Sequence, residues 1–596
     1  MKWEWRYRME KLIDLIEVEV RKGFEKAGYE EQYAKVMLSS RPDLCEYQCN
    51  GAMPLAKQHK KAPLVIANEI VECLLESDKL ENVEAVPPGF LNFNLQKGFL
   101  ARYLGDMAVA EQLGVEQAKQ PKTIILDYGG PNVAKPLHVG HLRSAVIGES
   151  LKRITRYMGH KAISDIHLGD WGYQMGLIIT EVQARQPELP YFDETFAGDF
   201  PQDAPFTISE LEEIYPTASA KAKEDATYRE TALQATFLLQ NGHKGYRAIW
   251  KHIMDVSVAD LKGNYEKLGV SFDLWKGEAD VQPYIPDMIE EFKNKGYARV
   301  DDGALVIDVK EETDTKEIPP CMIQKSDGAS LYGTTDLATL LEREKLYHPD
   351  EVVYIVDKRQ ELHFVQVFRA AKQTGIVGAE TNLQFLGFGT MNGKDGKPFK
   401  TRDGGVMRLE NFINEICDEM YKKIMENRTV AEEEAQKTAN IVGISAIKYG
   451  DLSNQIAKDY VFDVERFTSF EGNTGPYILY TIVRIKSILQ KSQCSEDAMK
   501  KMIIREALAA SEKNLMLEVA RWSSVIDKVY EELAPHKLCA YVYDLANAFN
   551  RFYHETKILT EENEERKASY IKLLSLTKAI LETGINLLGF EAPERM

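Results

Sequence analysis

Apolar spacing predicts a small mixed module at the start of the chain. Across Lys11–Ala27, apolar residues recur at three- and four-residue intervals, which predicts an amphipathic helix. Gly89–Leu95 instead alternates apolar and polar residues, which predicts a strand with one buried face. The basic run Lys57–Lys61 between them is as typical of a solvated loop as of a binding surface.

The pattern changes near residue 120, where a parallel sheet is predicted. Thr123–Tyr128 is an apolar run followed by two glycines and a proline, as expected for a buried strand and a turn. A helical segment follows from about Leu137 to Met158, and Ala162–Ile166 reads as a second strand. Strand, helix and strand at this spacing form a βαβ unit.

Acidic helical segments, among them Ser209–Ile214 and Lys221–Gln240, then interrupt the sheet pattern. Strands resume at Val352–Val356 and Leu383–Phe388, which indicates an insertion within a nucleotide-binding fold. Beyond residue 409 nearly everything reads as helix, ending in long amphipathic runs typical of an α-bundle.

We therefore expect a multidomain α/β protein with a Rossmann-like parallel-sheet core, an N-terminal α+β module and a C-terminal α-helical bundle. The predicted boundaries are 1–112, 113–408 with the insertion at about 183–300, 409–473 for a helical connector, and 474–596 for the bundle.

Composition narrows the class of protein. The 596 residues are 44% hydrophobic and 28% charged, which is ordinary for a globular chain. Seven scattered cysteines, no signal-type segment and no long apolar run predict a reduced, cytoplasmic protein with no membrane span. The net charge of −18 excludes indiscriminate coating of nucleic acid, although local basic patches remain compatible with selective binding.

The segment PNVAKPLHVGH (Pro131–His141) carries the sharpest chemical signal. His138 and His141 lie three apart where a helix begins, and Gly140 leaves room for a close approach. Free N–H groups at a helix N-terminus favour phosphate, and imidazoles beside them can stabilise developing charge. Two structural histidines at a helix start are the alternative for this spacing taken alone.

The surrounding residues favour the catalytic interpretation. Pro131–His141 resembles the HIGH signature of class I aminoacyl-tRNA synthetases, here as HVGH. The longer stretch PNVAKPLHVGHLRSAVIG, with HLGDWG at His167–Gly172, is similar to arginyl-tRNA synthetases in particular. The resemblance extends over most of the chain and includes Gln48–Met53, Gly475–Tyr480 and Ala592–Met596.

The second class I signature, KMSKS, has a divergent counterpart in the glycine- and lysine-rich segment Gly393–Gly405. Such a loop suits triphosphate binding, although taken alone it would also fit a solvated loop. We hypothesise that Lys135, Lys400 and Arg402 share the neutralisation of ATP and are catalytic together with His138 and His141.

Recognition of arginine requires carboxylates, because a guanidinium offers five donors and no acceptor. Asp127 lies at a predicted strand end, where α/β sheets bind ligands, and Asp336 follows Tyr332 by four on a predicted helix. Alone, each acid would more often be a cap or a solvated charge.

The resemblance implies that Asp336 holds the guanidinium with Tyr332 packed against it. It also implies that Asn132 and Gln360 hold the amino and carboxylate ends and that Asp127 holds the ammonium or guanidinium. The residues implied to bind ATP are Gly140, His138, His141, His363, Gln366, Met391 and Lys394. Magnesium is expected with ATP, and no tightly bound metal or organic cofactor is expected.

Two C-terminal segments, Gly475–Lys486 and Leu538–Tyr553, interleave aromatic and basic residues, which can stack unpaired bases and hold phosphates of single-stranded RNA. Core packing explains any one tyrosine equally well. The resemblance implies tRNA contacts for Tyr477, Tyr480, Arg484 and Met596 in the bundle, and for Gln48, Asn50 and Lys57–Lys61 in the N-terminal module.

The sequence thus predicts an arginine–tRNA ligase that forms arginyl-adenylate from arginine and ATP and transfers arginine to tRNA(Arg). The resemblance implies that it is a monomer. Two alternatives stay open. One is a class I synthetase for another amino acid or a related HxGH nucleotidyltransferase, and the other is a non-catalytic RNA-binding paralogue.

Overall fold

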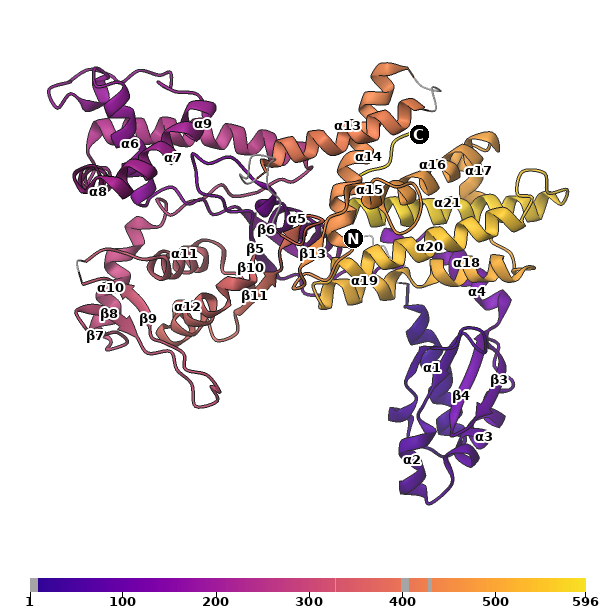
Figure 1. Ribbon diagram of the computed structural model, residues 1–596. Coiled ribbons are helices and arrows are strands. Elements are labelled where there is room, and N and C mark those ends of the chain that lie inside the picture. The colour runs from indigo at the N-terminus through magenta and orange to yellow at the C-terminus, as the bar shows by residue number, and fades with distance from the viewer. Residues whose placement is uncertain (1–8, 327, 398–406, 427–430) are drawn as a thin grey trace, which may run out of the picture. The chain divides into compact units, whose positions relative to one another are not determined.

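The computed structural model describes residues 9–326, 328–397, 407–426 and 431–596. The chain divides into two compact units (Figure 1). Residues 1–118, 470–587 and 591–596 form the first unit. Residues 119–469 and 588–590 form the second, which we call the catalytic unit.

The first unit begins with an antiparallel sheet in the order β1-β2-β4-β3. The strands are β1 (Val36–Leu38), β2 (Tyr47–Cys49), β3 (Leu80–Val86) and β4 (Phe90–Leu95), and the helices are α1 (Leu12–Lys26), α2 (Ala52–His59), α3 (Pro63–Leu74) and α4 (Lys97–Met107). The predicted N-terminal helix and strand are both confirmed as α1 and β4. The expectation of one buried face is wrong for β4, because Asn92 is buried along with Leu91 and Phe93.

Helices make up the rest of the first unit, as predicted. They are α16 (Gly475–Lys491), α17 (Glu496–Lys501), α18 (Ala510–Ala520), α19 (Trp522–Glu531), α20 (Pro535–Glu555) and α21 (Glu564–Leu587). Helix α16 begins at Thr474, whose hydroxyl accepts the backbone N–H of Tyr477 and so caps the helix. The central α20 buries an apolar stripe that includes Leu538, Val542 and Phe549.

The catalytic unit is built on a parallel sheet in the order β11-β10-β5-β6. Its strands are β5 (Thr123–Tyr128), β6 (Lys161–Asp165), β10 (Glu351–Asp357) and β11 (Asn382–Phe388), and α5 (Val139–Tyr157) connects β5 to β6. The chain winds outward from β5 on one side and from β10 on the other. Ligands bind at such a switch point, outside the carboxyl ends of the strands.

The catalytic unit has further elements before and after these strands, and the insertion helices extend away from the sheet at the upper left of Figure 1. The insertion helices are α6 (Tyr173–Arg185), α7 (Ile208–Glu224), α8 (Ala226–Gln240) and α9 (Lys244–Lys267). They are followed by α10 (Ile285–Asn294), the antiparallel β7 (Arg299–Asp301), β8 (Ala304–Ile307) and β9 (Cys321–Gln324), then α11 (Tyr332–Tyr347) and α12 (Glu361–Thr374). The last elements are β12 (Met391–Asn392), α13 (Leu409–Glu426), α14 (Glu432–Leu452), β13 (Tyr460–Val461) and α15 (Val464–Phe467).

One helix prediction is wrong in its extent. Lys221–Gln240 is divided at Asp225, whose backbone is extended and whose carboxylate accepts the N–H groups of Thr227 and Tyr228. An aspartate that caps a new helix outweighs the continuous helical pattern.

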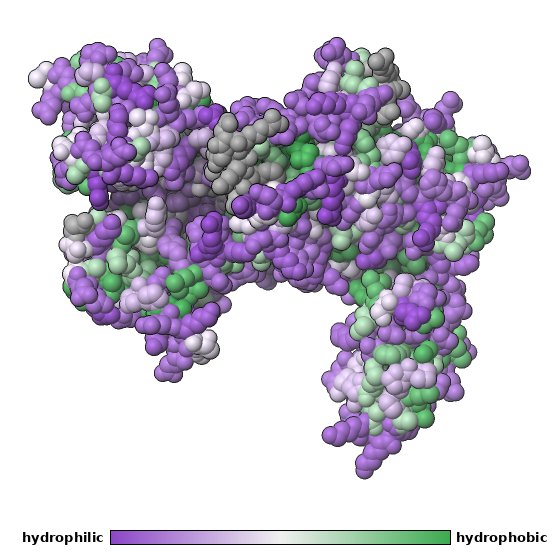
Figure 2. Space-filling view, viewed as in Figure 1, coloured by the Kyte–Doolittle hydropathy of each residue, from purple (hydrophilic) through white to green (hydrophobic). Residues whose placement is uncertain are grey.

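Figure 2 shows a mainly hydrophilic face over the insertion helices at its upper left. In the described ranges no helix is both long and apolar enough to span a membrane.

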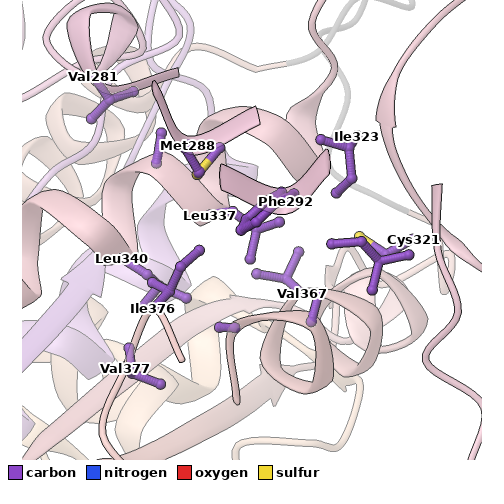
Figure 3. Close-up of a cluster of buried hydrophobic side chains, with 14 of the residues drawn as sticks. Val281, Met288, Phe292, Cys321, Ile323, Leu337, Leu340, Val367, Ile376 and Val377 are labelled. Carbon is purple, nitrogen blue, oxygen red and sulfur yellow. The ribbon is translucent and has the colours of Figure 1, made fainter. Parts of the chain in front are cut away.

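A single apolar cluster holds α10, α11 and α12 against β8, β9 and β10 (Figure 3). Leu337 of α11 is fully buried in it, near Phe292 of α10 and Val367 of α12. Because α11 also carries Tyr332 and Asp336, this cluster fixes the position of two predicted site residues.

We predict that Leu337→Ala lowers the free energy of unfolding of the catalytic unit by about 2–5 kcal/mol, because it leaves a cavity in this cluster. Leu346→Ala on the same helix is the control, since Leu346 is 52% exposed. Urea unfolding measures both, and an equal loss in the two variants would contradict the assigned packing.

Candidate active site

A cavity of about 570 Å³ lies at the switch point of the parallel sheet. It is lined by residues from β5, α5, α11, β10 and α12 and by the loops that follow the strands. It brings together many of the residues predicted from the sequence. These are Asp127, Asn132, His138, Gly140, His141, Tyr332, Asp336, Gln360 and His363.

The two histidines form one stacked pair at the start of α5. His138 is the N-cap of the helix, and its ring lies 3.9 Å from that of His141, centroid to centroid. Nδ1 of His138 accepts the N–H of Gly140, and Nδ1 of His141 accepts the N–H of His138. A neutral ring that accepts at Nδ1 carries its proton on Nε2, so each ring has one N–H left for a ligand.

Burial keeps both rings neutral. It lowers the pKa of His138, and the positive charge of Lys135 lowers it further. The pKa of His141 falls to about 3, through burial first and then through His138 and Lys135. The pair can therefore donate hydrogen bonds to a phosphate at neutral pH without first losing a proton.

Gly140 is required by the geometry of the pair. A Cβ at this position would lie 2.7 Å from Cε1 of His138. The close approach predicted from the sequence is thus made by the His138 ring itself.

The expectation of free N–H groups at this helix start is wrong for its first three residues. Val139 donates to the carbonyl of Met407, Gly140 to His138 Nδ1, and His141 to the carbonyl of His138. The donors that His138 and His141 have left after these contacts are their Nε2–H groups, and both residues line the cavity.

A buried arginine that the sequence analysis missed organises the cavity floor. Nη2 of Arg343 lies 2.5 Å from Asp127 and 2.8 Å from Asp165, and Nη1 donates to the hydroxyl of Tyr354 at 3.1 Å. These partners lie on β5, β6 and β10, respectively. Arg343 on α11 therefore joins three strands directly beneath the cavity.

Glu278 is a second residue that the sequence analysis missed. Its segment runs beside the loop after β6, with bridges from Leu168 to Gly277 and from Asp165 to Leu274. Burial raises the pKa of Glu278, and the charge of His167 opposes that rise. Because no strand or helix pattern marks residues 274–280, only the acid itself was visible in the sequence.

Asp336 and Tyr332 both reach the cavity from α11. Asp336 accepts from Nε2 of His363 at 2.5 Å, which orients one of its oxygens. Tyr332, four residues earlier on α11, is 72% exposed and lines the cavity. The predicted shared helix face of Tyr332 and Asp336 is confirmed.

Four other predicted residues lie outside the cavity lining. Gln366 donates to the carbonyls of Pro319 and Pro320, and Met391 is buried in β12. Lys394 pairs with Asp463 at 3.1 Å, and Lys135 lies 4.4 Å above the ring of Tyr215. Lys135 still acts on both histidines through its charge. Lys400 and Arg402 fall outside the described residues.

In the first unit, three of the predicted RNA-contacting residues line one pocket. Tyr480, Arg484 and Met596 surround a hollow of about 850 Å³. The guanidinium of Arg484 lies 4.8 Å from the ring of Tyr480, which is 42% exposed. Tyr477 lies one turn earlier on α16, where its hydroxyl donates to Asn547. An exposed aromatic ring beside a cation suits base stacking.

The N-terminal candidates lie in the other part of that unit. Gln48 on β2 donates to Asn92 on β4 at 2.9 Å, and Asn50 follows the end of β2. The structure places neither residue in the pocket around Tyr480.

Comparisons with known proteins agree with this architecture. Residues 104–464 match the family model of the catalytic domain of class I tRNA synthetases (R). Residues 10–95 match the arginyl tRNA synthetase N terminal domain, and residues 478–596 match the DALR anticodon binding domain.

Full-length relatives and solved structures extend the match. An arginine–tRNA ligase of Agathobacter rectalis is 62% identical, over 99% of this chain and 100% of the relative. One of Alkaliphilus oremlandii is 55% identical, also over 99% and 100%. In fold, the chain is similar to arginyl-tRNA synthetase from Plasmodium falciparum, with a TM-score of 0.81 at 24% identity over 99% and 100% of the two chains.

A parallel sheet with an HVGH helix at its switch point and a matching catalytic-domain model defines a class I aminoacyl-tRNA synthetase. With the two further domain matches and the 62% identical relative, the chain belongs to the arginyl-tRNA synthetase family.

The depressed histidine pKa values predict a pH dependence of stability. A neutral folded-state His141 contributes stability fully above the unfolded-state pKa of about 6.5, and this contribution is lost as the pH falls from there toward about 3. We expect His141→Asn to flatten the decline in unfolding free energy between pH 6.5 and 4. Urea titrations at several pH values measure this, and an unchanged slope would contradict the assigned burial.

Proposed function

We infer that this chain is an arginine–tRNA ligase that uses ATP. The arginine carboxylate attacks the α-phosphate of ATP to give arginyl-adenylate and pyrophosphate, and a terminal ribose hydroxyl of tRNA(Arg) then takes the arginyl group. One observation supports this most strongly. A neutral histidine pair and the acids Asp127, Glu278 and Asp336 share a single cavity.

The acids suit a cationic amino acid. A guanidinium is a planar fork of donors that pairs strongly with carboxylates and matches lysine poorly in geometry. We propose that Asp336 and Glu278 receive the guanidinium, with Tyr332 over it. The hydrogen bond from His363 pre-orients Asp336 for this contact. Binding of the cation would also favour the ionised form of Glu278, whose pKa burial raises.

The other end of arginine is proposed to lie toward β5. Asp127 keeps one oxygen on Arg343, so its second oxygen is available for the substrate ammonium. Asn132 and Gln360 line the same cavity and offer amide groups for the ammonium and carboxylate.

Activation is proposed to rest on position and electrostatics. The Nε2–H groups of His138 and His141 donate to the α-phosphate as its charge grows, which stabilises the transition state. Lys135 adds positive charge nearby, and Lys400 and Arg402 remain predicted contributors from the KMSKS-like loop. Gln366, Met391 and Lys394 also remain predictions as ATP-binding residues, as do Gly140 and His363.

Magnesium is proposed to enter with ATP. In the described part of the chain, no group of three or more His, Cys, Asp or Glu side chains could hold a metal ion. Phosphate oxygens and water would then supply most ligands, which is the usual mode for Mg²⁺. The ion would neutralise phosphate charge.

The tRNA is proposed to contact the pocket around Tyr480, Arg484 and Met596, with Tyr477 beside it. Gln48, Asn50 and Lys57–Lys61 are proposed as a second contact in the N-terminal part of the unit. A monomeric state and a cytoplasmic location are further proposals from the sequence.

Aminoacylation of total tRNA with labelled arginine, lysine, glutamate and cysteine tests the proposal. We expect charging by arginine alone. Asp336→Asn should lower kcat/KM for arginine about 100-fold or more, because a charge-assisted pair is lost at a partly buried carboxylate. Asp287→Asn, on the exposed side of α10, is the matched control and should behave as wild type.

Charging by a different amino acid would overturn the substrate assignment. An unchanged kcat/KM in Asp336→Asn, with arginine still the substrate, would remove Asp336 from the guanidinium site but leave the reaction intact.

A further inference from the structure

The three residues that directly follow α21 belong to the catalytic unit. Leu588–Phe590 cluster with residues 119–469, whereas α21 before them and residues 591–596 after them belong to the first unit. Leu588 and Phe590 are buried, and the ring of Phe590 lies 6.5 Å from that of Tyr449 on α14. We call Leu588–Phe590 the tail anchor.

The tail anchor has one direct polar bond to α14. Nζ of Lys448, which is fully buried, donates to the carbonyl of Gly589 at 2.5 Å. Gly589 has a φ of +90°, and a Cβ there would lie 2.8 Å from Lys448 Nζ. The lysine therefore needs the Gly589 carbonyl as its acceptor, and the position of its ammonium group leaves no room for a side chain at residue 589.

Charge balance does not explain Lys448. The charged groups that face it are Glu149, Lys152 and Arg153, all on α5. Glu149 is already paired with Lys152 at 2.6 Å and with Arg153 at 2.7 Å. Burial lowers the pKa of Lys448 to about 7, which means that placing the charged amine here is unfavourable for folding. Its direct hydrogen bond goes to the tail anchor.

The lysine lies in the assembly that positions the catalytic helix. Arg143 of α5 pairs with Asp451 of α14 at 2.9 Å, and both side chains are buried. Glu149 is two helical turns beyond His141 on α5 and accepts the backbone N–H of Ser271. The carbonyl of Ser271 accepts the hydroxyl of Tyr128, which lines the substrate cavity. A shift at Lys448 thus reaches both the histidine pair and the cavity wall through rigid, buried contacts.

We propose that Lys448 is a positioning residue that bonds the tail anchor to α14 beside Glu149 of α5, and so links the tail anchor to the placement of His138 and His141. This inference rests on the proposed ligase function.

Two single variants of the full chain test the contact from its two sides. Lys448→Met keeps the apolar volume and removes the donor, whereas Gly589→Ala keeps the lysine and displaces the carbonyl. We expect each to lower kcat for aminoacylation about tenfold, with KM for arginine within about twofold of wild type, because the imidazoles move while Tyr332 and Asp336 are held by α11. If Lys448→Met does not fold, Gly589→Ala alone still tests the contact.

The double variant and a matched glycine decide between a positioning role and general destabilisation. The combined effect on kcat should not exceed that of the more severe single variant, since both break one contact. Gly296→Ala is the control, because Gly296 has a φ of +69° and nothing within 4 Å of a Cβ. It should lose stability without losing kcat.

Additive losses in the double variant, or single variants with wild-type kcat, would overturn the proposal. A wild-type chain that does not charge tRNA with arginine would instead overturn the ligase function, so the two failures are distinguishable.

Discussion

One buried guanidinium holds the site together. Arg343 is 1% exposed and binds Asp127, Asp165 and Tyr354, which lie on three strands of the parallel sheet. It lies seven residues, or two turns, after Asp336 on α11, so both side chains project from one face of that helix. Removing a partner of such a buried network typically costs about 3–5 kcal/mol. The register of α11 over the sheet, and hence the position of Asp336, depends on this interaction.

The same enclosure determines the chemistry of the cavity. Burial holds His138 and His141 neutral, and their Nδ1 atoms are occupied by backbone donors, so one tautomer is selected. It also raises the pKa of Glu278, so a cation bound there would favour the ionised carboxylate. A site built on such paired hydrogen bonds can reject an analogue that lacks the matching donors by about 10⁴–10⁵-fold without editing. The histidine donors and the carboxylates of Asp127, Glu278 and Asp336 thus line one cavity.

Local patterns predicted the elements well because the burial of each strand and helix follows its own periodicity. Thr123–Tyr128 and the helix after HVGH are where the sequence places them, and Asp127 and Asp336 both reach the cavity. What the sequence could not show depends on distant contacts. Glu278 enters through a bridge beside Leu168, and Arg343 finds carboxylates 178 and 216 positions away. Gln366 shares α12 with His363, yet it turns to the Pro319 and Pro320 carbonyls.

The central claim is that carboxylates held by this frame select a guanidinium by charge as well as by shape. Calorimetric titration of the wild-type chain with arginine and with citrulline tests it directly. Citrulline keeps the planar shape, but it is uncharged and has a carbonyl oxygen in place of one NH2 group of the guanidinium. The account predicts that arginine binds and that citrulline binds at least about 100-fold more weakly. Equal affinity for the two would contradict it, since shape alone would then explain recognition.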